Sequence, residues 1–172
     1  GIGLELDIPF AAIAAGLANY SGVYRRFEFK GTVNEITVYD DYAHHPTEIQ
    51  ATLEAFKDSS SRRIVALYQP HLYSRTRDFA VEFGNSFFHC DQLLLAPIYP
   101  AREAPIEGVS SKLIADVAIG CGHRGVNLID SNDKIVEETL AILQPGDILV
   151  TMGAGNIWQY GEEILAALKE KY

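Results

Sequence analysis

The hydrophobic pattern of this sequence alternates between two periods. Runs of apolar and β-branched residues predict strands at 34–39, 64–68, 92–96, 126–129 and 147–151. Between them, apolar residues recur every three or four positions, which predicts helices beginning near residues 46, 72, 110, 134 and 157. This alternation predicts a three-layer, Rossmann-like α/β domain with a mostly parallel sheet of about five or six strands.

The first forty residues depart from this alternation. Strands at 27–30 and 34–39, on either side of Gly31, predict a β-hairpin that leads into the sheet. Upstream, residues 8–19 predict an alanine-rich helix with one apolar face. We expect this face to pack against another domain, with Ser21-Gly22 as a hinge, so that residues 22–172 form the domain itself.

The amino-acid composition limits the functions that this chain can have. The chain has 172 residues, with 14 basic and 23 acidic side chains and a formal charge of -9, which argues against nucleic acid or an anionic membrane as a partner. Cys90 and Cys121 form no C-x-x-C pair, and we expect both to be reduced core thiols of a cytoplasmic protein. The chain begins at Gly1 without a methionine, which suggests a fragment of a longer protein.

Chemically capable side chains gather where the strand at 34–39 ends. The run Asp-Asp-Tyr-Ala-His-His fills residues 40–45, and ligands of open α/β sheets bind beyond the carboxyl ends of strands. Carboxylates there can accept hydrogen bonds from ribose hydroxyls, and imidazoles can orient an anion, bind a metal or transfer a proton. A structural interpretation also applies: the aspartates accept hydrogen bonds from loop amides, and Thr47 with Gln50 forms a capping box. We expect both interpretations to hold.

A second polar stretch, residues 69–77, follows the strand at 64–68. It opens a helix whose core face carries Phe79, Phe83 and Phe87. Because the helix dipole disfavours cations at a helix start, Arg75 and Arg77 suggest a bound carboxylate. The alternative is surface ion pairing with acidic neighbours, Asp78 and Glu82.

Two further places carry weaker signals. The adjacent arginines 25 and 26 enter a predicted strand, so one of them can turn inward while the other stays at the surface. The Gly-Ala-Gly run at 153–155 lacks the third small residue of a dinucleotide fingerprint, because position 158 is Trp158, and it favours a tight strand-to-helix turn.

Together these motifs resemble the C-terminal domain of the Mur ligases, the ATP-dependent enzymes that build the peptide of bacterial peptidoglycan. The matching runs are residues 22–28, 40–48, 69–76 and 153–157. The doubled histidine is similar to the member that joins L-alanine to UDP-N-acetylmuramate through an acyl phosphate. The sequence contains no G-x-x-x-x-G-K-[S/T] loop for the ATP phosphates. The resemblance therefore implies that a central domain, whose tail is residues 1–21, holds ATP phosphates and Mg²⁺, and that an N-terminal domain holds the UDP-sugar.

The resemblance also implies roles for single residues. Arg26 would contact the ATP phosphates and Asp41 the ribose, and no residue here is expected to bind a metal. The L-alanine pocket would be lined by Tyr42, His44, His71 and Arg75, with His44 and His71 as candidate catalytic residues. Secondary candidates are His45, Arg77, Arg102, Glu103, Gly153 and Gly155. One departure from the motif is Leu72, where some members carry a second arginine, so carboxylate binding falls to Arg75 and Arg77.

Three alternatives remain open. A ligase of the same family that recycles a whole peptide shares the doubled histidine, but tends to carry Phe at the position of Tyr42. A metallohydrolase could use side chains from two strand ends, namely Asp40, Asp41, His44, His45 and His71. The third alternative is a binding module that catalyses no reaction.

Overall fold

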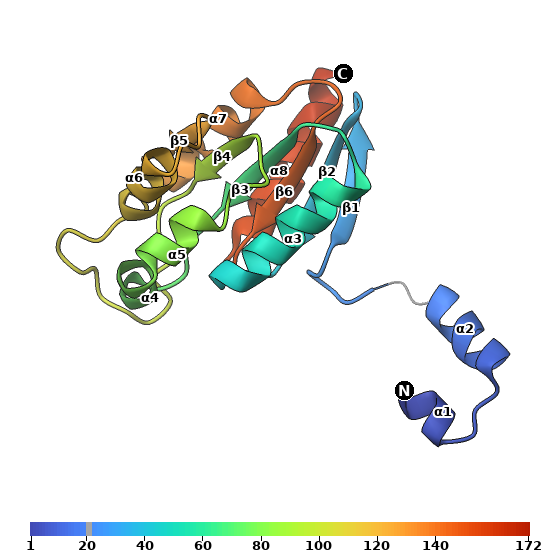
Figure 1. Ribbon diagram of the computed structural model, residues 1–172. Coiled ribbons are helices and arrows are strands. Elements are labelled where there is room, and N and C mark those ends of the chain that lie inside the picture. Colours follow the sequence, from blue (N-terminus) through green and yellow to red (C-terminus); the bar gives the residue numbers. More distant parts are fainter. Residues whose placement is uncertain (20–21) are drawn as a thin grey trace.

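The computed structural model describes residues 1–19 and 22–172, and its centre is a six-stranded sheet (Figure 1). The strand order is β1-β2-β6-β3-β4-β5. β1 is antiparallel to β2, and every other neighbouring pair is parallel. The strands are β1 (Glu28–Val33), β2 (Ile36–Asp41), β3 (Ile64–Tyr68), β4 (Gln92–Leu95), β5 (Val126–Leu128) and β6 (Ile148–Met152). The predicted mostly parallel sheet entered through a hairpin is thus confirmed.

Helices cover both faces of the sheet, which makes three layers. One core cluster joins the sheet to α3, α5 and α6, and a second joins it to α7 and α8. The elements are α1 (Ile2–Glu5), α2 (Phe10–Ala18), α3 (Pro46–Ser59), α4 (Tyr73–Asp78), α5 (Ala80–Asn85), α6 (Lys112–Gly120), a 3₁₀ turn (Asn132–Lys134), α7 (Ile135–Ile142) and α8 (Ile157–Lys171).

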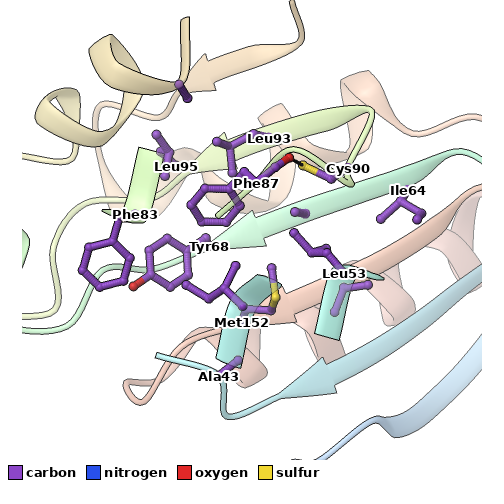
Figure 2. Packing of buried hydrophobic residues seen from close by; sticks show 14 of the residues in the cluster. Ala43, Leu53, Ile64, Tyr68, Phe83, Phe87, Cys90, Leu93, Leu95 and Met152 are labelled. Carbon is purple, nitrogen blue, oxygen red and sulfur yellow. Dashed lines mark hydrogen bonds between the residues drawn. The ribbon is translucent and has the colours of Figure 1, made fainter. Parts of the chain in front are cut away.

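The core on the α3 side is built around one aromatic residue of β3. Tyr68 is fully buried, with its ring centroid 5.7 Å from that of Phe83 and 5.2 Å from that of Phe87 (Figure 2). The expectation for Phe79 was wrong, because that side chain is 39% exposed. Its φ of −119° interrupts the helix between α4 and α5, so only Phe83 and Phe87 keep the core-facing direction.

Two local predictions were also wrong in detail. The hairpin turns at Asn34 and Glu35, which both have positive φ, whereas Gly31 forms a bulge inside β1. The start of α3 is capped by Glu48 rather than by the expected pair Thr47 and Gln50. Its carboxylate accepts hydrogen bonds from the amides of His44 and His45, at 3.1 and 3.2 Å.

The two cysteines differ in environment. Cys90 is buried as expected, and burial raises the pKa of its thiol. Cys121 is exposed, because it lies at the end of α6, beyond the residues of that helix that face the core. The prediction of two core thiols therefore holds for Cys90 only.

The N-terminal helices have a different character from the sheet domain. Neither α1 nor α2 contains a buried residue, and their large apolar side chains, such as Phe10 and Leu17, are 72% and 71% exposed. The expected hinge at Ser21 lies outside the described residues. Within the described ranges, no helix combines the length and the apolar character that a membrane crossing needs.

Candidate functional site

The sheet order brings the predicted site stretches together. β2, β6 and β3 are parallel neighbours, so their carboxyl ends meet at one edge, where β2 ends with Asp40 and Asp41 and is followed by residues 42–45, and where residues 153–156 and 69–75 follow β6 and β3. The ring centroids of His44 and His71 lie 6.4 Å apart, and Tyr42 packs edge-on against His44 at 5.0 Å. Three of the four residues expected to form an amino-acid pocket are therefore neighbours in space.

A residue that the sequence analysis did not single out completes this group. Tyr99, in the loop after β4, stacks on His71 with centroids 5.7 Å apart. The backbone of Tyr99 forms hydrogen bonds with the residues before and after His71. The Tyr99 amide donates to the Pro70 carbonyl, and the Leu72 amide donates to the Tyr99 carbonyl. This pairing holds the histidine loop against the loop after β4, and only the tertiary fold reveals it.

Buried polar atoms without a partner concentrate in one stretch. Over the described residues, four buried side-chain atoms lack a hydrogen bond, and all fall between residues 68 and 75: Tyr68 OH, Gln69 Oε1, His71 Nδ1 and Arg75 Nη1. Folded proteins pair nearly all such atoms, so a cluster of exceptions indicates a place where a ligand or water is bound. The cluster includes both donors and acceptors.

The helix-dipole argument for Arg75 was wrong. Because α4 ends at Asp78, Arg75 and Arg77 lie in its last turn, where cations are favoured. Arg77 forms a surface pair with Asp78 at 2.7 Å, as the alternative interpretation predicted for it. Among the residues that the structure describes, Arg75 has no such ion-pair partner, and the argument for its role rests instead on its buried, unpaired Nη1.

His71 is held in its neutral form. Burial lowers its pKa most, the positive charge of Arg75 and the neighbouring His44 lower it further, and Glu103 opposes them. A neutral imidazole offers one nitrogen as donor and the other as acceptor. The site therefore presents a hydrogen-bonding imidazole beside a permanent cation at neutral pH.

The lowered pKa of His71 predicts a loss of stability in acid. The unfolded chain, with an ordinary histidine pKa, binds the proton first, so the free energy of unfolding should fall as pH drops below about 6.5 and level off below the folded-state pKa. Thermal unfolding of His71→Asn between pH 7.5 and 5.5 should show a smaller fall than the wild type. His89→Asn, outside the site, serves as the control. Equal falls in wild type and His71→Asn would contradict the prediction.

Arg25 links the end of β2 to the turn that follows β6. Its Nε donates to Asp40 Oδ2 at 2.7 Å, and its Nη2 and Nη1 donate to the carbonyls of Gly153 and Gly155 at 2.7 and 3.2 Å. Asp40 Oδ1 accepts in turn from the hydroxyl of Thr151 at 2.7 Å. The prediction that one of the paired arginines turns inward is confirmed, although the pair precedes β1 rather than entering it.

Arg26 and Asp41, which we expect to contact the phosphates and the ribose of ATP, occupy different environments. The side chain of Arg26 is 45% exposed, with Nη2 3.2 Å from Glu48 Oε1. Asp41 is buried, and its two oxygens accept from the amides of Phe27 and Ala43, at 3.0 and 2.8 Å. Burial raises the pKa of Asp41, although the hydrogen bonds from these amides and the positive charge of Arg26 act to lower it. The amide-acceptor interpretation of Asp41 is confirmed, and its ribose contact stays a prediction.

The Gly-Ala-Gly run forms a tight turn rather than an anion cradle. Its carbonyls face Arg25, and the Gly153 amide donates to the carbonyl of Asp41 at 3.3 Å. Gly153 has a φ of +142°, which favours glycine. A Cβ at Gly155 would lie 2.5 Å from Gln69 Oε1 and 2.7 Å from Tyr99 Cγ, so only glycine permits this approach.

The remaining secondary candidates lie around this edge. Glu103 accepts hydrogen bonds from the amide and hydroxyl of Ser74, which lower its pKa and fix the start of α4. His45 packs edge-on against Phe79, with centroids 5.7 Å apart, and Arg102 is exposed. Within residues 1–19 and 22–172, no three His, Cys, Asp or Glu side chains group as metal ligands, so these residues offer no set for Mg²⁺ or for the metallohydrolase alternative.

Comparison with known proteins identifies the family of this chain. The family model described as "Mur ligase, glutamate ligase domain" matches residues 25–155. The chain is 51% identical over 170 residues to the UDP-N-acetylmuramate–L-alanine ligase of Geobacter sulfurreducens, covering 98% of the chain and 37% of that protein. It is 47% identical over 169 residues to the ligase of the same name from Salinibacter ruber, covering 98% of the chain and 36% of the relative. The chain thus spans little more than a third of these relatives.

Solved structures show the same fold. A murein peptide ligase from Psychrobacter arcticus superposes with a TM-score of 0.71 at 27% identity, covering 90% of this chain and 32% of that one. The UDP-N-acetylmuramate–alanine ligase of Thermotoga maritima gives a TM-score of 0.79 at 21% identity, covering 99% and 36%. With the matched family model and the sequence relatives, the conclusion is direct: this chain belongs to the Mur ligase family.

Proposed function

We propose that this chain is the amino-acid-binding part of an ATP-dependent ligase that joins L-alanine to UDP-N-acetylmuramate, with residues 1–21 as the tail of a preceding domain. The observation that carries the proposal is the cluster of unpaired buried polar atoms at residues 68–75, beside Tyr42 and His44. The names of the relatives that are about half identical support the substrate pair.

The polar groups at this edge would suit a small amino acid. The Arg75 guanidinium has a free buried donor for a carboxylate, and Arg–carboxylate pairs are strong and directional. His71, neutral and with an unpaired Nδ1, can hydrogen-bond the amino group, and the ring of Tyr42 lies beside His44 at the same edge of the sheet. These contacts would fix the amine towards an incoming electrophile.

The chemistry we propose is positioning. The carboxylate of the sugar substrate attacks the γ-phosphate of ATP, which gives an acyl phosphate and ADP. The amine of L-alanine then attacks the acyl carbon, an amide bond forms and phosphate leaves. Holding the amine close and aligned removes much of the entropic cost of this second step. His44 and His71, whose ring centroids lie 6.4 Å apart, are the groups that we propose to accept the ammonium proton.

Fewer observed contacts support the proposed nucleotide-binding part of the site. Arg26 is exposed and within reach of an anion, and it would meet the ATP phosphates. Asp41 would meet the ribose only if its carboxylate turned away from the amides of Phe27 and Ala43. Mg²⁺ would come with the phosphates and be held by residues outside this chain.

Phosphate release from ATP tests the proposal. The assay compares L-alanine with a tripeptide, with UDP-N-acetylmuramate present, for this chain alone and for the chain joined to its native upstream residues. We expect release only in the joined form and only with L-alanine. Release with the tripeptide instead would assign the recycling ligase, and release in neither case would refute both.

A further inference from the structure

One polar atom of the unpaired cluster lies deeper than the amino-acid pocket. The Tyr68 side chain is fully buried in the core on the α3 side, and its hydroxyl has no hydrogen-bond partner among the described residues. In Figure 2 the hydroxyl lies beside the ring of Phe83, at the end of β3 that leads into the histidine loop. A phenylalanine at this position would fill the space as well as the tyrosine ring does, so packing does not explain the hydroxyl.

A buried hydroxyl without a partner is costly. Leaving such a group unpaired costs about 1–3 kcal/mol of stability, whereas a phenylalanine would not incur this penalty. A tyrosine at this position is therefore expected to gain a partner in some state of the protein. That partner has to be a side chain, a ligand or a water close to the carboxyl end of β3.

Arg75 is the complementary group. The Phe79 amide donates to the Arg75 carbonyl and the Phe83 amide to the Phe79 carbonyl, so successive turns connect Arg75 to the ring that Tyr68 contacts. Nη1 of Arg75 is a buried donor without an acceptor, and a phenolic oxygen accepts. The positive charge of Arg75 is also near enough to oppose the rise that burial causes in the pKa of Tyr68.

We infer that Tyr68 is a positioning residue for Arg75: when the amino-acid carboxylate is bound, the Tyr68 hydroxyl accepts a hydrogen bond from Nη1 and fixes the guanidinium against the substrate. This inference rests on the proposed function. Tyr68 touches neither substrate nor reacting atoms, so its effect passes through Arg75 alone.

The test is Tyr68→Phe in the complete gene product that contains this chain. We expect the KM for L-alanine to rise about threefold to tenfold, as for the loss of one hydrogen bond, while the KM for ATP and kcat stay unchanged. The unfolding temperature should not fall, because the ring is kept and an unpaired hydroxyl is removed. Tyr160→Phe, against the core on the other face of the sheet, is the matched control and should change none of these.

A double variant separates this role from a purely structural one. In an Arg75→Ala background, Tyr68→Phe should add no further rise in KM, because the hydroxyl acts through the missing guanidinium. An unchanged KM in the single variant, or additive effects in the double variant, would overturn the inference and leave the proposed function intact. A wild type without L-alanine-dependent phosphate release would overturn both.

Discussion

Replacing Arg25 with alanine should destabilise the domain by about 3–5 kcal/mol, the largest effect that we expect from a single substitution here. The change leaves the carboxylate of Asp40 buried beside Thr151 without its counter-charge, and leaves the carbonyls of Gly153 and Gly155 without a donor. Chemical denaturation of the chain, followed by circular dichroism, measures the free energy of unfolding directly.

The neighbouring arginine is the matched control. Arg26 has the same side chain but is largely solvated, so Arg26→Ala should cost no more than about 1 kcal/mol. Similar losses for the two variants would show that the buried pair of Arg25 and Asp40 is not what holds the strand ends together. A double variant, Arg25→Met with Asp40→Asn, should recover part of the loss, because no unpaired charge then remains buried.

Arg75→Ala should weaken amino-acid binding in the complete ligase by about 1–3 kcal/mol, which is roughly a 5- to 150-fold rise in the KM for L-alanine. The KM for ATP should stay nearly unchanged, since the proposed nucleotide contacts come from the other side of the site, at Arg26 and Asp41. Steady-state phosphate release at saturating ATP and sugar substrate measures both constants.

Arg77 provides the comparison on the same helix turn. It is half exposed and paired with Asp78, so Arg77→Ala should leave the KM for L-alanine within about twofold. If Arg75→Ala raised both KM values together, or lowered the unfolding temperature as far as Arg25→Ala, Arg75 would be a structural residue. In that case the amino-acid pocket would have to lie elsewhere.

The sequence predicted best those elements in which the spacing of the apolar residues matches the residues that are buried in the fold. The strand at 64–68 is fully buried and consists of four aliphatic residues and one tyrosine, and its bounds were correct to the residue. The polar runs after β2 and β3 were also found, because parallel strands place their carboxyl ends together. What periodicity could not show was the break at Phe79, where one backbone angle redirects a regular four-residue pattern.

The parts of the site that were missed depend on contacts distant in sequence. The sequence predicts that one of the two adjacent arginines turns inward, but only the partners of Arg25, 15 to 130 residues away, show which one it is. Tyr99 follows an ordinary strand, and nothing local marks it as the residue that stacks on His71. The helix start of α3 was misjudged because Pro46 is its first residue and His45 its N-cap, which puts Glu48 rather than Gln50 in the third position of the capping box.

The Gly-Ala-Gly turn has a mechanical consequence. On one side, its carbonyls accept hydrogen bonds from the guanidinium of Arg25, which neighbours the proposed nucleotide contacts. On the other side, it lies directly against Gln69 and against Tyr99, the residue that stacks on His71. Neither side can shift without pushing the other, since Gly155 has no room even for a methyl group. The nucleotide and amino-acid contacts should therefore travel as one rigid body, and any closure around substrates must bend the protein outside this turn.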